Sequence, residues 1–193
     1  MADTGERITT LFALYRDYGN TDYIGESVSQ IQHMVQCAEL AEKEGYDEDV
    51  VLGAFFHDVG HLIGLKDSSY GRMGQLGTVN HEEVGARYLK SIGFSDTICN
   101  IVRGHVSAKR YLVYKEPHYY ESLSDASKGT LVHQGGAMSE EEARDFENFP
   151  SFRAILRMRY WDDKAKDPSI PVSEESLKKY EKLSRKLLDN VAQ

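Results

Sequence analysis

Apolar residues recur every three or four positions along most of the chain, which is the spacing of one face of an α-helix. The pattern is clear from Ile8 to Tyr15, from Val28 to Ala41 and from Val50 to Phe55. Helices are also predicted over six later segments: Val84–Ile92, Ile98–Val102, Ser124–His133, Ser139–Phe146, Phe152–Trp161 and Leu177–Val191. Several begin with a Ser or Asp that can cap a helix. No segment alternates as a strand does, so the sequence predicts an all-α helical bundle.

The length and the hydrophobic content predict one domain over residues 1–193, because 193 residues with 40% hydrophobic content can bury one sizeable core. Three glycines, Gly71, Gly74 and Gly77, fall in the segment from Lys66 to Asn80. We expect a flexible loop there, inside the domain, that can cover a site.

The formal charge of -8 opposes general binding to nucleic acid, so an anionic ligand needs a local cationic pocket. The first twenty residues carry several charges, and no apolar run reaches membrane-spanning length. We therefore expect a cytoplasmic protein that does not cross a membrane. Cys37 and Cys99 lie far apart within apolar-periodic segments, so we expect buried free thiols, as suits a reducing compartment. The oligomeric state is left open by the sequence.

The string AFFHDVGHL places His57 and Asp58 directly after an apolar run, in a predicted helix. Adjacent helical side chains diverge by about 100 degrees, so both can reach one interior cavity. A buried charged Asp is costly unless a metal or another partner compensates it. A carboxylate in this position can bridge two cations.

Other predicted helices or their boundaries offer further ligand types, namely His33, His81, His105 and Asp162. Any one of these histidines is more often a core or surface residue than a ligand, but the set taken together favours a metal site. Imidazoles with carboxylates suit Fe, Mn, Zn, Ni or Co better than Mg alone, and spacing does not choose among them.

Helical spacing adds three polar residues to this group. His61 follows His57 by four residues and Lys109 follows His105 by four, so each pair shares a face if the helix continues. Arg159 precedes Asp162 by three, which fits either an anion-binding fork or an ordinary ion pair. His61 is equally compatible with a packed structural role.

The order H…HD…H…H…D resembles the HD superfamily, specifically its mixed-valent diiron oxygenases, which include myo-inositol oxygenase; simpler phosphohydrolases of the superfamily show H…HD…D. The resemblance implies two Fe ions in the mixed-valent Fe(II)/Fe(III) state, with O2 as cosubstrate. One iron would be held by His33, His57, Asp58 and Asp162, and the second by the bridging Asp58 with His81 and His105. Asp163 competes with Asp162, and the WDD string favours Asp162.

Within this group the chain is most similar to the organophosphonate oxygenases that cleave a carbon–phosphorus bond, over a metal-binding core of about residues 23–166, with a C-terminal helix over about 174–191. The resemblance implies catalytic roles for Tyr23, Glu26 and His61, and Tyr23 would occupy an iron position until substrate displaces it. It implies substrate contacts from His61, Lys109, Ser127, Gln134 and Arg159. Taken without the family, Tyr23, Glu26, Ser127 and Gln134 are ordinary residues of helix ends and caps.

The resemblance implies a small hydroxyphosphonate as substrate. A 1-hydroxy-2-(trimethylamino)ethylphosphonate would give glycine betaine and phosphate, and the 2-amino analogue would give glycine and phosphate. The twelve tyrosines favour the trimethylated form slightly, because some could build an aromatic box, among them Tyr15, Tyr18, Tyr70, Tyr111, Tyr114, Tyr119 and Tyr120. Two alternatives stay open: an HD-type metal-dependent phosphohydrolase, and a non-catalytic ligand-binding signalling module.

Overall fold

The protein is described here by a computed structural model that covers residues 3–23 and 25–191. These residues form helices joined by turns and loops, and the only strand-like pairings among them are two isolated β-bridges. The all-α prediction is therefore confirmed. The helices are α1 (Thr4–Tyr18), α2 (Gln30–Lys43), α3 (Glu48–Phe56), α4 (Val59–Lys66), α5 (His81–Ser91), α6 (Asp96–Lys115), α7 (Tyr119–Ser122), α8 (Asp125–His133), α9 (Glu140–Glu147), α10 (Phe152–Lys164) and α11 (Glu174–Val191).

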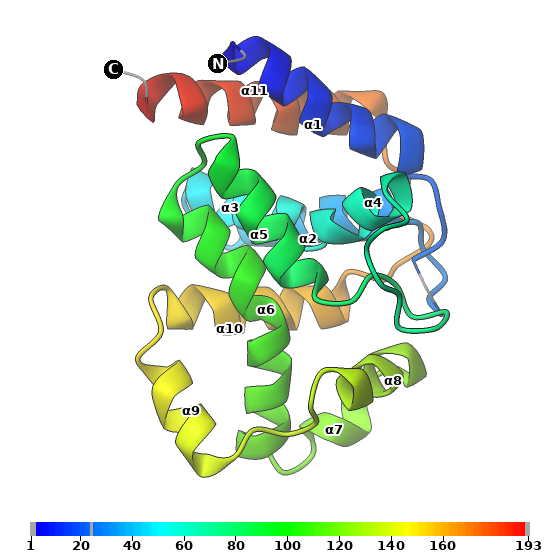
Figure 1. The fold of residues 1–193 in the computed structure, drawn as a ribbon, viewed down its shortest axis with the longest axis vertical. Coiled ribbons are helices and arrows are strands. Elements are labelled where there is room, and N and C mark those ends of the chain that lie inside the picture. Colours follow the sequence, from blue (N-terminus) through cyan, green and yellow to red (C-terminus); the bar gives the residue numbers. More distant parts are fainter. Residues whose placement is uncertain (1–2, 24, 192–193) are drawn as a thin grey trace.

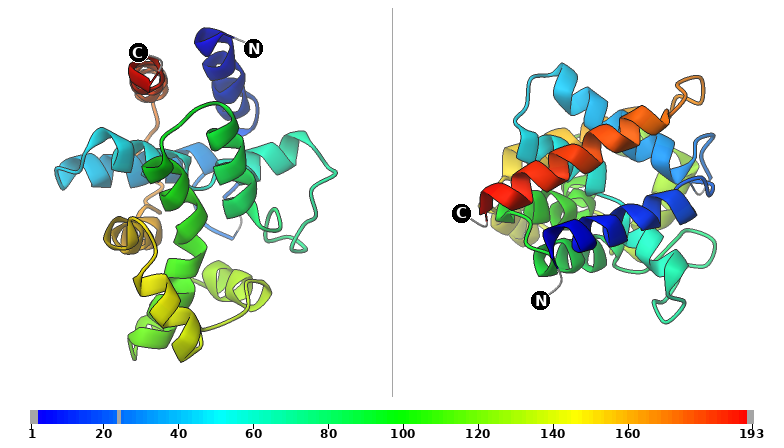
Figure 2. Two further views of the ribbon diagram at one scale, coloured as in Figure 1. Left: turned by 60° about the vertical axis from the view of Figure 1, so that its left-hand side comes forward. Right: turned by 90° about the horizontal axis from the view of Figure 1, so that it is seen from above.

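Helices α2, α3, α5, α6 and α10 form the centre of the bundle, and α6 runs from this centre down to the smaller helices α7, α8 and α9 (Figure 1). Helices α1 and α11 lie side by side across the opposite end (Figure 2). Aromatic rings join these layers, because Phe55 at the end of α3 stacks on Tyr15 of α1 at 4.8 Å and on Tyr180 of α11 at 4.6 Å. This packing fixes the end of α3, where the His57–Asp58 pair begins.

The predicted helix through AFFHDVGHL is broken in the structure. Helix α3 ends at Phe56 and α4 begins at Val59, with Asp58 at φ -104° and ψ 12°, outside the helical region. Close packing of α4 on α5 accompanies the break: a Cβ at Gly60 would lie 1.9 Å from the carbonyl oxygen of His81. His57 and His61 therefore do not share one helix face, and that part of the prediction was wrong.

The segment between α4 and α5 is a loop, as the glycines predict. It folds back on the bundle through the bridge between Arg72 and Thr78, and the side chains of Met73 and Thr78 are buried. Cys37 and Cys99 are free and buried, as expected. Among the described residues, no helix has both the length and the apolar character needed to cross a membrane.

Candidate metal centre and substrate cavity

Asp58 lies at the centre of a ring of histidines, in the turn between α3 and α4. Its Oδ2 is 3.2 Å from Nε2 of His57. Its Oδ1 is 3.2 Å from Nε2 of His81 and 3.4 Å from Nε2 of His105. The two oxygens of one buried carboxylate therefore face two separate groups of imidazole nitrogens.

The first group joins α2 and α10 to the end of α3. Nε2 of His33 lies 3.1 Å from Nε2 of His57 and 3.4 Å from Oδ1 of Asp162. The Nδ1 atoms of both rings face backbone carbonyls, of Ala165 at 2.9 Å and of Ala54 at 2.8 Å. Each Nδ1 therefore carries a proton and donates it, which leaves a lone pair on each Nε2.

The second group joins α5 and α6. Nε2 of His81 lies 3.0 Å from Nε2 of His105. Nδ1 of His105 donates to the carbonyl of Val102 at 2.7 Å, so its Nε2 also presents a lone pair. Both rings are buried, as are His33 and His57.

These residues fit metal ions. The Nε2 lone pairs of the neutral His33 and His57 rings face each other at 3.1 Å and repel unless a cation lies between them. Ligands bound at about 2.1 Å with right angles between them lie about 3 Å apart, which is the spacing found here. Burial opposes the charge on Asp58, but His57, His105 and His81 outweigh it and hold the pKa of this carboxyl well below its usual range. The charged carboxylate that a bridging ligand requires is therefore favoured.

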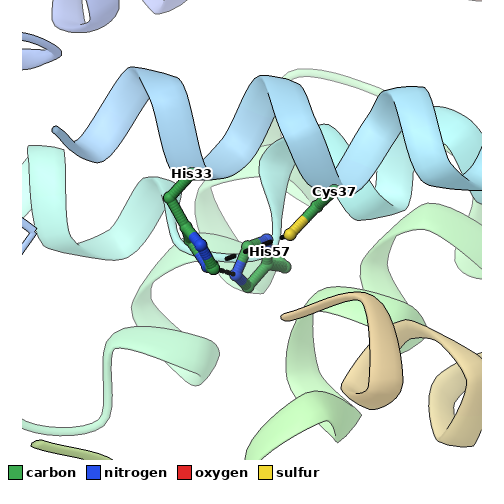
Figure 3. Close-up of side chains that lie close together, drawn as sticks. All are labelled: His33, Cys37 and His57. Carbon is green, nitrogen blue, oxygen red and sulfur yellow. Dashed lines mark hydrogen bonds between the residues drawn. The ribbon is translucent and has the colours of Figure 1, made fainter. Parts of the chain in front are cut away.

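Cys37 lies beside the first group, one helical turn after His33, and its sulfur points toward the two imidazoles (Figure 3). Its Sγ is 3.9 Å from Nε2 of His33. Burial, followed by the charge of Asp162, raises the pKa of the Cys37 thiol well above its usual value. Asp58 and Asp162 already supply charged oxygens on this side, so we assign Cys37 to packing.

A cavity opens beside the two groups, and all the predicted site residues except His33 and His57 line it. It is lined by Asp58 and Asp162, by His61, His81 and His105, by Tyr23 and Glu26, which were expected to be catalytic, and by the expected substrate residues Lys109, Ser127, Gln134 and Arg159. The buried oxygen of the Gln134 side chain has no hydrogen-bond partner among the described residues. A polar atom buried in this way is suited to a ligand.

Lys109 reaches this cavity from α6, which continues as a helix well past His105 and so keeps both side chains on one face. Its Nζ donates to Oγ1 of Thr130 at 2.7 Å and to the carbonyl of Ser127 at 3.4 Å. Burial, followed by the charge of Arg159, lowers the pKa of Lys109 to about 7. A bound anion would restore its charge.

Arg159 is held from several sides. Its Nη1 donates to Oδ2 of Asp162 at 2.5 Å, its Nη2 donates to Asp163, and its Nε donates to the hydroxyl of Tyr119 at 2.9 Å. Arg159 therefore forms the intrahelical ion pair with Asp162 and also lines the cavity. Asp162 faces His33 whereas Asp163 pairs with Arg159, so geometry also favours Asp162 as the ligand.

His61 keeps its place at the metal centre in spite of the helix break. The backbone N–H of Thr78 donates to Nδ1 of His61 at 3.1 Å, so the proton of this ring is on Nε2. Burial and the nearby His81 lower the pKa of His61, which favours the neutral ring. Nε2 lies 3.9 Å from Oδ1 of Asp58, too far for a hydrogen bond, and its N–H is available to the cavity.

Tyr23 and Glu26 lie on the turn before α2. The Tyr23 ring stacks on the His33 ring with centroids 4.0 Å apart. Glu26 Oε1 accepts from Lys166 Nζ and from Ser124 Oγ, both at 2.6 Å. Ile24 lies outside the described residues.

The structure also identifies residues that the sequence did not single out. Thr130 lies three residues after Ser127 on the same face of α8, so helical spacing in the sequence could have identified it. The contacts of Lys166 and Thr78 join segments that are distant in the sequence, so no local sequence pattern indicates them.

Tyr119 contacts Arg159 but does not line the cavity, and among the described tyrosines only Tyr23 does. The aromatic box suggested for a quaternary ammonium is therefore absent from the described cavity lining.

Comparison with known proteins agrees with this geometry. The sequence profile of the HD domain matches residues 31–168. A [1-hydroxy-2-(trimethylamino)ethyl]phosphonate dioxygenase (glycine-betaine-forming) of Leisingera caerulea is 37% identical over 84% of this chain and 81% of its own length. A hydroxymethylphosphonate dioxygenase of Gimesia maris is 35% identical over 87% of this chain and 82% of its own length. An uncharacterized protein of Acanthamoeba polyphaga mimivirus is 45% identical over 83% of this chain and 73% of its own length. The chain therefore belongs to the HD domain family, in the group that includes these phosphonate dioxygenases.

Proposed function

We propose that the protein is a diiron oxygenase that uses O2 to cleave the carbon–phosphorus bond of a small 1-hydroxyphosphonate and release phosphate. The observation that carries the proposal is Asp58, whose two oxygens face two separate pairs of histidines beside a cavity with buried cations. His33, His57, Asp58 and Asp162 would hold one ion. Asp58, His81 and His105 would hold the other.

The stoichiometry of this reaction requires O2 and no added reductant. The C–P bond breaks, one new C–O bond forms on C1 and one new P–O bond forms on phosphorus. The two oxygen atoms gained equal one O2, whose four-electron reduction matches the oxidation of the hydroxyphosphonate to a carboxylate and phosphate. When bound, the irons supply O2 activation and take part in these electron transfers.

The residues of the chain position and neutralise the substrate. Lys109 and Arg159 offset the phosphonate charge, and Ser127, Thr130 and Gln134 offer polar groups along the same wall. His61 presents its Nε2–H toward the space beside Asp58 and can donate to a substrate oxygen. Tyr23, whose ring stacks on His33, would be exchanged for substrate at the first ion.

Three substrates are to be compared. A 1-hydroxy-2-(trimethylamino)ethylphosphonate would give glycine betaine and phosphate, its 2-amino analogue would give glycine and phosphate, and hydroxymethylphosphonate would give formate and phosphate. The names of the two phosphonate-oxidising relatives support the first and the last. Two free cysteines also suit the reducing cytoplasm as the place of action.

The decisive test measures phosphate release by the iron-loaded protein with and without O2. We expect phosphate from at least one hydroxyphosphonate, with one O2 consumed for each phosphate, and none under argon. Phosphate release from a phosphate ester under argon would instead establish the hydrolase. Tight phosphonate binding without turnover would establish the ligand-binding module.

A further inference from the structure

We propose that the preferred substrate is a hydroxyphosphonate whose C1 bears hydrogen or a small uncharged group, so that hydroxymethylphosphonate reacts better than either ammonium-bearing candidate. This inference rests on the proposed function and deepens it, because it concerns only which hydroxyphosphonate reacts. It follows from the charges around Glu26 in the cavity wall.

Only one cavity carboxylate is left to recognise a cationic substrate. Three carboxylates are found among the described lining residues: Asp58, Asp162 and Glu26. Asp58 is surrounded by histidine nitrogens, and Asp162 pairs with Arg159 and faces His33. A substrate ammonium would therefore have to pair with Glu26.

Lys166 already pairs with Glu26. Its Nζ lies 2.6 Å from Oε1 of Glu26, and the Ser124 hydroxyl donates to the same oxygen at 2.6 Å. The Glu26 and Lys166 side chains are 12% and 16% exposed, so water screens the pair only weakly. A substrate ammonium beside Glu26 would meet the like charge of Lys166, and such a juxtaposition is unfavourable.

The cavity also lacks the aromatic surface that a quaternary ammonium needs. A trimethylammonium group donates no hydrogen bond and is bound mainly by aromatic faces. Tyr23 is the single Phe, Tyr or Trp among the described lining residues, and its ring is stacked on His33. One ring already in contact with an imidazole does not form a box.

The turn that carries Glu26 is packed on α8, which limits the room for a bulky head group. Gly25 has a φ of +75°, and a Cβ there would lie 2.9 Å from the Cβ of Ala126. Ser124 ties the same turn to the start of α8, because its hydroxyl contacts Glu26 while it caps the helix. A trimethylammonium group beside Glu26 would require this contact to open.

The test compares kcat/KM for phosphate release by the iron-loaded protein with the three hydroxyphosphonates named above. We expect hydroxymethylphosphonate to exceed each ammonium-bearing substrate by about tenfold or more, the size of effect expected from one uncompensated like-charge contact. Formate should accumulate with phosphate in equal amounts. Anaerobic calorimetric titration should rank the three ligands in the same order.

Variants test the stated cause. Lys166→Met frees Glu26, so kcat/KM for the 2-amino substrate relative to hydroxymethylphosphonate should rise about tenfold. The double variant Glu26→Gln with Lys166→Met should lose that gain. Lys164→Met removes an exposed lysine two residues away and should leave the ratio unchanged. Circular dichroism melting checks that each variant is folded.

Each outcome decides a different point. A wild-type preference for either ammonium-bearing substrate, or a folded Lys166→Met protein with an unchanged ratio, would overturn this inference and leave the oxygenase function intact. Absence of phosphate from all three substrates in air would overturn the proposed function instead. If Lys166→Met does not fold, the wild-type ranking alone decides the inference.

Discussion

Lys109 is expected to make substrate capture depend on pH close to neutrality. Its pKa is lowered from 10.5 to about 7, by burial first and then by the charge of Arg159. About half of the free protein then carries the ammonium at pH 7, and about a tenth carries it at pH 8. The neutral amine cannot offset a phosphonate charge, so kcat/KM should fall about tenfold for each pH unit above this range.

The assay is the initial rate of phosphate release at low substrate concentration between pH 6 and 9. Lys109→Arg keeps a cation at every pH in this range, so the decline above neutrality should disappear. Lys109→Met should lower kcat/KM about thirtyfold or more, which corresponds to roughly 2 kcal/mol, because the phosphonate dianion loses a buried cationic partner. Lys115→Met, an exposed lysine on the same helix, is the matched control and should behave as the wild type does.

The second ionisation of the substrate affects all variants alike, so the ratio of wild type to Lys109→Met isolates the lysine. A ratio that stays constant across the pH range would refute the reasoning, as would a Lys109→Arg protein with the wild-type decline.

The same pKa shift affects the stability of the folded protein. The unfolded chain binds more protons than the folded one between pH 7 and 10.5, so this residue makes stability rise with pH in that window.

Three other changes test the metal centre. His105→Ala should reduce bound iron from two ions to one per chain by elemental analysis and abolish phosphate release; two ions retained would contradict the second group of ligands. Gly77→Ala should lower both stability and activity, because its Cβ would lie 2.5 Å from the His61 ring. Gly74 is the control: it also has a positive φ but faces open space, so Gly74→Ala should lower stability alone. Cys37→Ala should keep both irons and cost roughly 1 kcal/mol of unfolding free energy from the lost packing; loss of one iron would make the thiol a ligand.

The helical fold was predictable because apolar spacing records which face of each helix is buried. The prediction failed where buried residues are polar. Helix α6 extends to Lys115, yet the expected segment stopped at Val102, because His105 and Lys109 interrupt the apolar pattern while being buried themselves. The break after α3 left no apolar signal either, because both sides of it are buried.

The candidate ligands were recoverable from their order along the chain, since each lies on or beside a helix whose face could be inferred. The contacts around them were not. Lys166 and Glu26 are separated by 140 residues, and charged residues are common on any helical surface. The N–H of Thr78 that fixes the His61 proton is a backbone group, which has no signature in the sequence.

The distribution of partners among the cations in and near the cavity shows how an acidic protein can hold a cationic site. Arg159 is compensated by Asp162 and Asp163, and Lys166 is compensated by Glu26. Lys109, in contrast, donates among the described residues only to the hydroxyl of Thr130 and to a backbone carbonyl. Neutral acceptors do not cancel a charge, which is why burial lowers the pKa of this lysine. Lys109 is thus the cavity cation whose charge a bound phosphonate would compensate, whereas Arg159 and Lys166 pair with carboxylates of the cavity wall.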